Sequence, residues 1–204
     1  PTFFRFCEEL LSYYRHDERI MVISGNNFQF GRSRTDYSYY FSRYNHIWGW
    51  ASWRRAWKYF DYDLKLWPKI RKENWLTSIL ENRKVVKYWT KNFQRTYEGD
   101  PTVWDYRWTF ACWIQNGLTI LPNVNLVSNI GFGEDATHTI GSKSRVANLP
   151  VRVCAGHALH LCGGLHHRVH GGVEQLPLAP HRAAVPRAQN HHPGVVLAGL
   201  GLLP

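Results

Sequence analysis

The sequence of 204 residues has no apolar run approaching the 18 or more residues that a membrane-spanning helix needs, and no charged-then-apolar leader opens it. We therefore expect neither a transmembrane helix nor a secretory signal. Cysteines are also few, and they form neither a dense disulfide framework nor a CxxC pair. They are Cys7, Cys112, Cys154 and Cys162. This usage favours reduced thiols in a cytosolic protein.

Aromatic residues are missing from residues 151–204, whereas all the Trp, Tyr and Phe lie in residues 1–150. The same stretch has no Lys and no Asp, and its eight His match no zinc-ligand spacing. Such a segment buries too little apolar surface to offset the entropy of ordering it. We therefore divide the chain into a folded part, residues 1–149, and a low-complexity His/Gly/Pro-rich tail, residues 150–204. Two interpretations of the tail stay open: a disordered segment, or the product of a shifted reading frame.

Basic residues exceed acidic ones, with 25 Lys and Arg against 15 Asp and Glu. Most of both kinds lie in the folded part. A basic balance suits anionic partners such as nucleotide diphosphates, nucleic acid or an acidic membrane face. It does not choose among them.

The spacing of apolar residues predicts alternating helices and strands. We expect helices over 2–15, 51–60, 86–97 and 103–116, and strands over 20–24, 118–121 and 124–128. Residues 31–45, rich in Tyr, Arg and Ser, have the composition of an exposed or ligand-facing loop. Alternation of this kind indicates an α/β layer architecture. Since few strands are visible and the first residues already read as a helix, we expect an N-terminal portion to precede this chain.

Three segments have residues suited to chemistry, and the first is a turn between two indoles. Gly49 stands between Trp48 and Trp50, where a glycine lets the backbone turn tightly. Indoles stack on the apolar faces of sugar rings and offer one N–H donor each, so this turn would make a carbohydrate wall. The alternative is that both tryptophans are core anchors.

The second segment places Asp105 in the expected first turn of a helix, between Trp104 and Trp108. The helix N-terminus stabilises an ionised carboxylate there, and such a carboxylate can take a proton from an attacking hydroxyl. An Asp at this position also caps helices without any catalytic role. Spacing alone leaves both interpretations open.

The third segment is a glycine-rich loop, SNIGFGEDATHT, which ends near His138. A loop of this kind can close over a diphosphate, with His138 as a metal or phosphate contact. Arginines, Arg107 among them, are candidate phosphate partners. The alternative for the loop and the arginines is a solvated surface.

Five segments, taken in order, resemble the C-terminal half of a bacterial nucleotide-sugar glycosyltransferase family. It is the group near glycosyltransferase family 2 that is sometimes labelled hemolytic-protein-like. The resemblance covers about residues 1–149. The segments are PTFFRFCEELL, IMVISGNNFQFG, YNHIWGWASWRRAW, VWDYRWTFACW and LPNVNLVSNIGFGEDATHT. Their order is also similar to that of N-acetylglucosaminyltransferase I.

The resemblance implies a partial glycosyltransferase A-type domain without its nucleotide-binding half, and it implies roles for particular residues. Asp105 falls where the catalytic base stands, and Trp48-Gly49-Trp50 falls beside the donor sugar. We also expect Arg107 to contact the substrate and His138 to contact the metal. Tyr106 departs from the helix start of N-acetylglucosaminyltransferase I, which has a second Asp at that place. The acidic metal-binding motif of the family corresponds to a position before Pro1, so we expect residues 1–204 alone to be weakly active or inactive.

The function that follows is transfer of a sugar, with inversion, from a nucleotide-sugar donor to a hydroxyl acceptor in bacterial surface-glycan synthesis. A divalent metal, Mn²⁺ or Mg²⁺, is expected in the complete domain. We expect a cytoplasmic location, extending to the inner face of the membrane, and no nucleic-acid partner. A non-catalytic carbohydrate-binding module is the main alternative. A basic protein that stacks bases on its aromatic residues ranks last, because no nucleic-acid motif is present.

Overall fold

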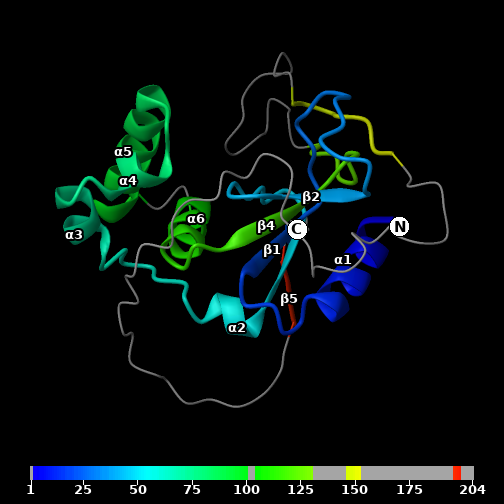
Figure 1. Ribbon diagram of the computed structural model, residues 1–204, viewed down its shortest axis with the longest axis horizontal. Helices are drawn as coiled ribbons and strands as arrows, with labels where there is room; N and C mark the ends of the chain where they lie inside the picture. Colours follow the sequence, from blue (N-terminus) through cyan, green and yellow to red (C-terminus); the bar gives the residue numbers. More distant parts are fainter. Residues whose placement is uncertain (1, 101–103, 131–145, 153–194, 199–204) are drawn as a thin grey trace.

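The computed structural model describes residues 2–100, 104–130, 146–152 and 195–198. Within these residues five strands form one mixed sheet in the order β2-β4-β1-β3-β5 (Figure 1). The strands are β1 (Ile20–Ser24), β2 (Tyr39–Ser42), β3 (Trp50–Trp53), β4 (Leu118–Pro122) and β5 (Val195–Ala198). The central pair, β1 and β4, is parallel, and the other neighbouring pairs are antiparallel. Helices packed on a mixed sheet confirm the predicted α/β class.

Six helices accompany this sheet in the described residues. They are α1 (Thr2–Tyr13), α2 (Arg54–Trp57), α3 (Trp67–Lys72), α4 (Trp75–Ile79), α5 (Arg83–Tyr97) and α6 (Trp104–Ile114). Helix α1 lies beside the sheet, whereas α3, α4 and α5 group together beyond α6 (Figure 1). None of the helices in the described part of the chain is both long and apolar enough to cross a bilayer.

The sheet is covered on both faces by apolar residues. Neighbouring residues of a strand point to opposite faces, and Trp50 and Ala51 on β3 accordingly belong to different core clusters. The Ala51 cluster includes Phe6 and Leu10 of α1. The Trp50 cluster joins the sheet to α6 and to the helices beyond it. Burial of both faces explains why the strands read as short continuous apolar runs.

Where apolar spacing was regular, the predicted elements are confirmed. The structure has α1, β1, α5, α6 and β4 within a few residues of their expected bounds. At α5, Asn82 accepts a hydrogen bond from the Lys84 backbone N–H (2.8 Å) and so caps the first turn. Gly99, which follows the helix, has φ of 97°, the left-handed conformation that commonly ends a helix.

The helix predicted over 51–60 is wrong in its first half. Residues Trp50–Trp53 form strand β3, and only the short α2 follows. The register pairs Ser24 with Trp50 and Val22 with Ser52. Since all four residues of β3 are buried, the strand shows no alternation of apolar and polar residues, and its two tryptophans imitate helical spacing.

Two further predictions on irregular segments are wrong. Residues 124–128 form no strand; the Leu126 N–H donates instead to the carbonyl of Gly25 (2.9 Å). The segment 31–45 is not entirely an exposed loop, because β2 lies inside it. Tyr39 of that strand is buried, with its hydroxyl 2.7 Å from the Tyr14 hydroxyl.

The boundary predicted at 149/150 falls in a short described segment, 146–152. The Arg152 N–H donates to the Asn125 carbonyl (2.8 Å), so the chain still contacts the folded part at that point. Strand β5, which lies in the predicted tail, pairs antiparallel with β3. The rest of the tail, 153–194 and 199–204, lies outside the described residues.

Candidate functional site

A cavity of about 190 Å³ brings together two of the predicted site residues, Asp105 and Trp48. The described residues that line it are Phe28, Asn45, His46, Ile47, Trp48, Trp89, Asp105, Tyr106 and Thr109. They come from the loop after β1, from the segment between β2 and β3, and from α5 and α6. The loop after β1 starts at the carboxyl end of a central strand, beside its parallel neighbour β4. Ligands of α/β proteins commonly bind at this end of a sheet.

The first turn of α6 contributes the carboxylate. Asp105 is partly buried at the second position of this helix, where the N-terminal dipole favours a negative charge. One turn later, the Thr109 hydroxyl is 3.0 Å from the Asp105 carbonyl and 2.7 Å from Asn45 Oδ1. These contacts tie the start of α6 to the segment before Trp48. The start of α6 is therefore held in place by the fold, and Asp105 lines the cavity.

Asn45 adds a hydrogen-bond donor to this cavity. Its Oδ1 accepts from Thr109, which fixes the orientation of the amide. Its Nδ2 is buried and finds no hydrogen-bond acceptor among the residues that the structure describes. A buried donor without a partner costs free energy, and a ligand hydroxyl would recover it.

Aromatic side chains form much of the cavity wall. The ring of Phe28 meets Trp48 edge to face, with centroids 5.3 Å apart. Tyr106 meets Trp89 in the same geometry at 5.6 Å, and its hydroxyl lies 3.0 Å from that of Tyr88. Burial and this contact raise the pKa of Tyr106 well above its ordinary value, so the phenol stays neutral. Walls of this kind offer flat apolar surface with polar edges.

His46 is a further polar group of the cavity. Its ring lies against Phe28, with centroids 4.5 Å apart, and burial lowers its pKa to about 4. The imidazole is therefore neutral at physiological pH and offers one donor and one acceptor nitrogen. Ser24 holds the backbone here: its hydroxyl donates to the His46 carbonyl (2.7 Å) and accepts from the His46 N–H (3.1 Å).

Gly49 is required here because the side chain of Val127 approaches its backbone closely. Its φ is not in the left-handed region. A Cβ at this position would stand 2.6 Å from Val127 Cγ2. Its carbonyl accepts a 2.7 Å hydrogen bond from the N–H of Gly25, which faces Val127 in the same way. The absence of a side chain lets the 127 segment pack against the bend that carries Trp48.

The other predicted site residues are elsewhere. Trp50 is only 2% exposed and packs on Trp57 and Trp108, so it is a core anchor and not a wall of the cavity. Arg107, also 2% exposed, donates to the carbonyl of Tyr62 (2.8 Å) and lies over the Tyr62 ring. It is absent from the lining of the cavity. Both side chains are therefore buried in structural contacts and are not among the described residues that line this cavity.

His138, predicted to contact a metal, lies outside the described residues together with the glycine-rich loop from 131 onward. In the described ranges no group of three or more His, Cys, Asp or Glu is arranged to hold a metal ion. The cysteines described there, Cys7 and Cys112, are buried free thiols, as expected. Burial raises the pKa of Cys7 to about 12.

Sequence reasoning did not single out His46, Asn45 or Thr109 as site residues. The first two stand immediately before Trp48 in the NHIWGW segment, which was a signal that could have been used. Thr109 lies four residues after Asp105, hence on the same face of α6. No spacing in the sequence connects Phe28 with the other lining residues, because only the tertiary fold brings it to the cavity.

No protein-family model, no curated protein and no solved structure matches this chain. We therefore infer function from the geometry of the cavity.

Proposed function

We propose that the cavity binds a sugar and that Asp105 is the base of an inverting glycosyl transfer from a nucleotide-sugar donor to a hydroxyl acceptor. The observation that carries this proposal is that Asp105 and Trp48 line the same cavity. A carboxylate can accept the proton of a sugar alcohol. An indole face in the same cavity can hold the apolar face of the sugar ring beside it. By the family resemblance, the reaction belongs to bacterial surface-glycan synthesis in the cytoplasm.

The proposed step is a single displacement. The Asp105 carboxylate accepts the proton of the acceptor hydroxyl while the acceptor oxygen forms a bond to the anomeric carbon. The bond from that carbon to the diphosphate oxygen breaks, and the nucleoside diphosphate leaves with the bonding electrons. Attack opposite to the leaving group inverts the anomeric carbon, and no covalent sugar–enzyme intermediate is needed. A divalent cation, Mn²⁺ or Mg²⁺, would supply charge neutralisation for the leaving diphosphate. Among the residues that the structure describes, no group of three or more His, Cys, Asp or Glu is arranged to hold it.

The remaining lining residues suit sugar hydroxyls. Neutral His46 can donate and accept, and the Nδ2 donor of Asn45 is free of any described partner. The cavity, at about 190 Å³, is smaller than the roughly 300–1,000 Å³ of pockets that hold drug-sized ligands. It therefore suits one sugar unit and not an entire nucleotide sugar.

The test is Asp105→Asn, assayed in the full-length protein, with Asp63→Asn as the matched control. Asp63 is exposed, and its nearest cation, Lys65, is 3.8 Å away. Loss of a general base typically lowers turnover by about 10²–10⁴-fold. We expect that loss for Asp105→Asn with sugar affinity nearly unchanged, and no loss for the control. Unchanged turnover would return Asp105 to a helix-capping role.

The aromatic wall also favours a second candidate, a carbohydrate-binding module without catalysis. Phe28, Trp48, Trp89 and Tyr106 are four of the nine described residues that line the cavity, and stacking alone gives affinity. This candidate predicts sugar binding that needs neither nucleotide nor metal, and no transfer by the complete protein. Transfer that depends on Asp105 would exclude it.

A further inference from the structure

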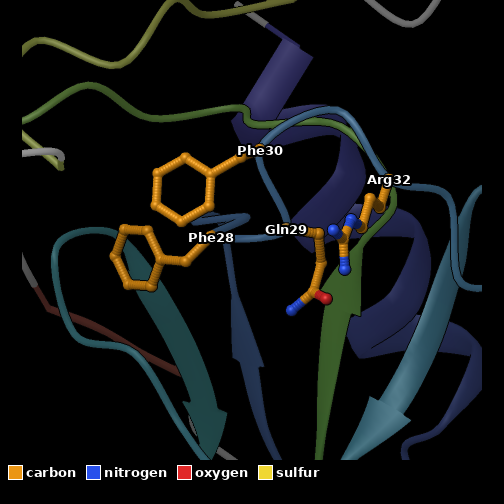
Figure 2. Close-up of a pocket in the computed structure, with 4 residues that line it drawn as sticks. All are labelled: Phe28, Gln29, Phe30 and Arg32. Carbon is orange, nitrogen blue, oxygen red and sulfur yellow. The ribbon is translucent and has the colours of Figure 1, made fainter.

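A second cavity, of about 420 Å³, lies beside the loop that follows β1. The described residues that line it are Phe28, Gln29, Phe30 and Arg32 (Figure 2). Phe28 also lines the sugar cavity described above. Its ring contacts His46 and Trp48 there, at 4.5 and 5.3 Å between centroids. The two cavities therefore share Phe28 as a lining residue.

The loop has a defined shape, because side-chain bonds pin it to the chain after β4. Asn27 Nδ2 donates to the carbonyl of Pro122 (2.7 Å), and the Asn27 N–H donates to Asn125 Oδ1 (3.0 Å). The Asn27 side chain also accepts the N–H of Gln29 (2.7 Å). Farther along, Asn123 Nδ2 donates to the Thr35 carbonyl (2.6 Å). The cavity is thus built on fixed backbone.

Two aromatic rings give this cavity a stacking surface. Phe28 and Phe30 turn their rings to the same side of the loop (Figure 2). Phe30 is 51% exposed, although it is a large apolar side chain. It also has φ of 52°, a conformation that is uncommon for a bulky residue. A loop that keeps such a ring in water provides a surface for the apolar face of a ligand.

The charge at this cavity is positive. Arg34 is occupied, since its Nε donates to Gln29 Oε1 (2.7 Å). Arg32 is exposed, and no side-chain hydrogen bond or ion pair engages its guanidinium within the described part of the chain. The single acidic residue of the loop between β1 and β2 is Asp36. Arg32 lines the same cavity as the two rings. A planar guanidinium matches a carboxylate or a phosphate ester bidentately.

We propose that this second cavity is a subsite for an anionic sugar unit, which continues the glycan held in the sugar cavity. Arg32 pairs with the carboxylate of a uronic acid or with a sugar phosphate, and Phe28 and Phe30 stack on the ring. The acceptor is accordingly an acidic glycan. This inference rests on the proposed function and adds the class of its acceptor.

The test is titration of the chain, at about 0.15 M salt, with three disaccharides that differ only in one terminal group. One is neutral, one ends in a uronate and one ends in a sugar phosphate. We expect at least one acidic ligand to bind about tenfold tighter than the neutral one, as a charge-assisted bidentate pair allows. Arg32→Gln should reduce that ligand to the affinity of the neutral disaccharide. The affinity for the neutral ligand should change less than about twofold.

Arg54→Gln is the matched control. Arg54 is exposed on α2, and it follows β3 at the end of the sheet opposite to the loop after β1. Its loss removes the same charge without touching the cavity, so the acidic preference should remain. The inference is overturned if wild-type protein shows no acidic preference, or if both variants weaken acidic binding equally. It is also overturned if a nucleoside diphosphate depends on Arg32 as strongly as the acidic sugar, because Arg32 would then be a donor contact.

Failure of the subsite can be separated from failure of the proposed function. Trp48→Ala should weaken all three disaccharides, whereas Arg32→Gln affects the acidic ones alone. Loss of the acidic preference with intact Asp105-dependent turnover overturns the subsite only. Turnover that ignores Asp105 overturns the proposed function, whatever the titrations show.

Discussion

Acid should destabilise this chain through one buried imidazole, that of His46. Its ring packs on Phe28 in the wall of the sugar cavity, and burial lowers its pKa to about 4. In the unfolded chain the same group has its ordinary value of about 6.5. Between these two values the unfolded chain binds a proton that the folded chain does not accept. The contribution of neutral His46 to the free energy of unfolding is therefore fully present above pH 6.5, and it is lost as the pH drops toward 4.

The magnitude follows from the two pKa values. Each tenfold difference in proton affinity corresponds to about 1.4 kcal/mol, so the largest loss is about 3 kcal/mol. The cavity is open to solvent on one side, which makes this an upper value. A loss of that size is a large part of the roughly 5–15 kcal/mol by which domains are stable.

The assay is urea unfolding at pH 7.5, 6.5, 5.5 and 4.5, followed by tryptophan fluorescence. Wild-type protein is compared with His46→Asn and with His16→Asn, which alters an exposed imidazole. We expect the free energy of unfolding to fall more steeply with acid in wild type and in His16→Asn than in His46→Asn. The difference should reach about 2–3 kcal/mol by pH 4.5. Parallel pH profiles for all three proteins would refute the burial argument.

Two further predictions concern the bend that carries the indoles. Gly49→Ala places a Cβ against Val127 and should lower the free energy of unfolding in urea by about 1–3 kcal/mol. Adding Val127→Ala to the same chain should recover part of that loss. If the losses from the two single variants simply add in the double variant, the proposed clash is contradicted. Trp50→Ala should lower stability by about 3–5 kcal/mol, since its ring is fully buried. Trp48→Ala removes a partly buried ring, so it should cost less stability and should weaken sugar binding. The same measured loss of stability in both tryptophan variants would show that the two residues share one role.

Helices and strands whose apolar residues recur at a regular spacing could be predicted from the sequence. Those without such spacing could not. Helix α1 places Phe6, Cys7, Leu10 and Leu11 on one buried face, which is the pattern that helical spacing detects. Strand β3 is buried on both faces and so has no alternation to detect. Helices α3 and α4 are too short, at six and five residues, to establish a period.

The site shows the same division between local and tertiary information. The position of Asp105 in the first turn of a helix was predicted from the local sequence alone and is confirmed. The sequence could not predict that His46 and Phe28 line the same cavity, because Phe28 lies in the loop before β2 in the chain and His46 lies in the loop after it. Only the pairing of β1 with β3 and β4 brings those loops to one end of the sheet.

The two indoles of the Trp48-Gly49-Trp50 turn show why composition alone could not separate wall from core. Trp50 is paired with Ser24 in the ladder between β1 and β3, so the register points its side chain to a covered face of the sheet. Trp48 stands two residues earlier, outside the ladder, where that register no longer applies. Along a continuous strand, residues two apart would share a face. The bend at Gly49, held against Val127, ends that relation and leaves Trp48 in the wall that Asp105 also lines.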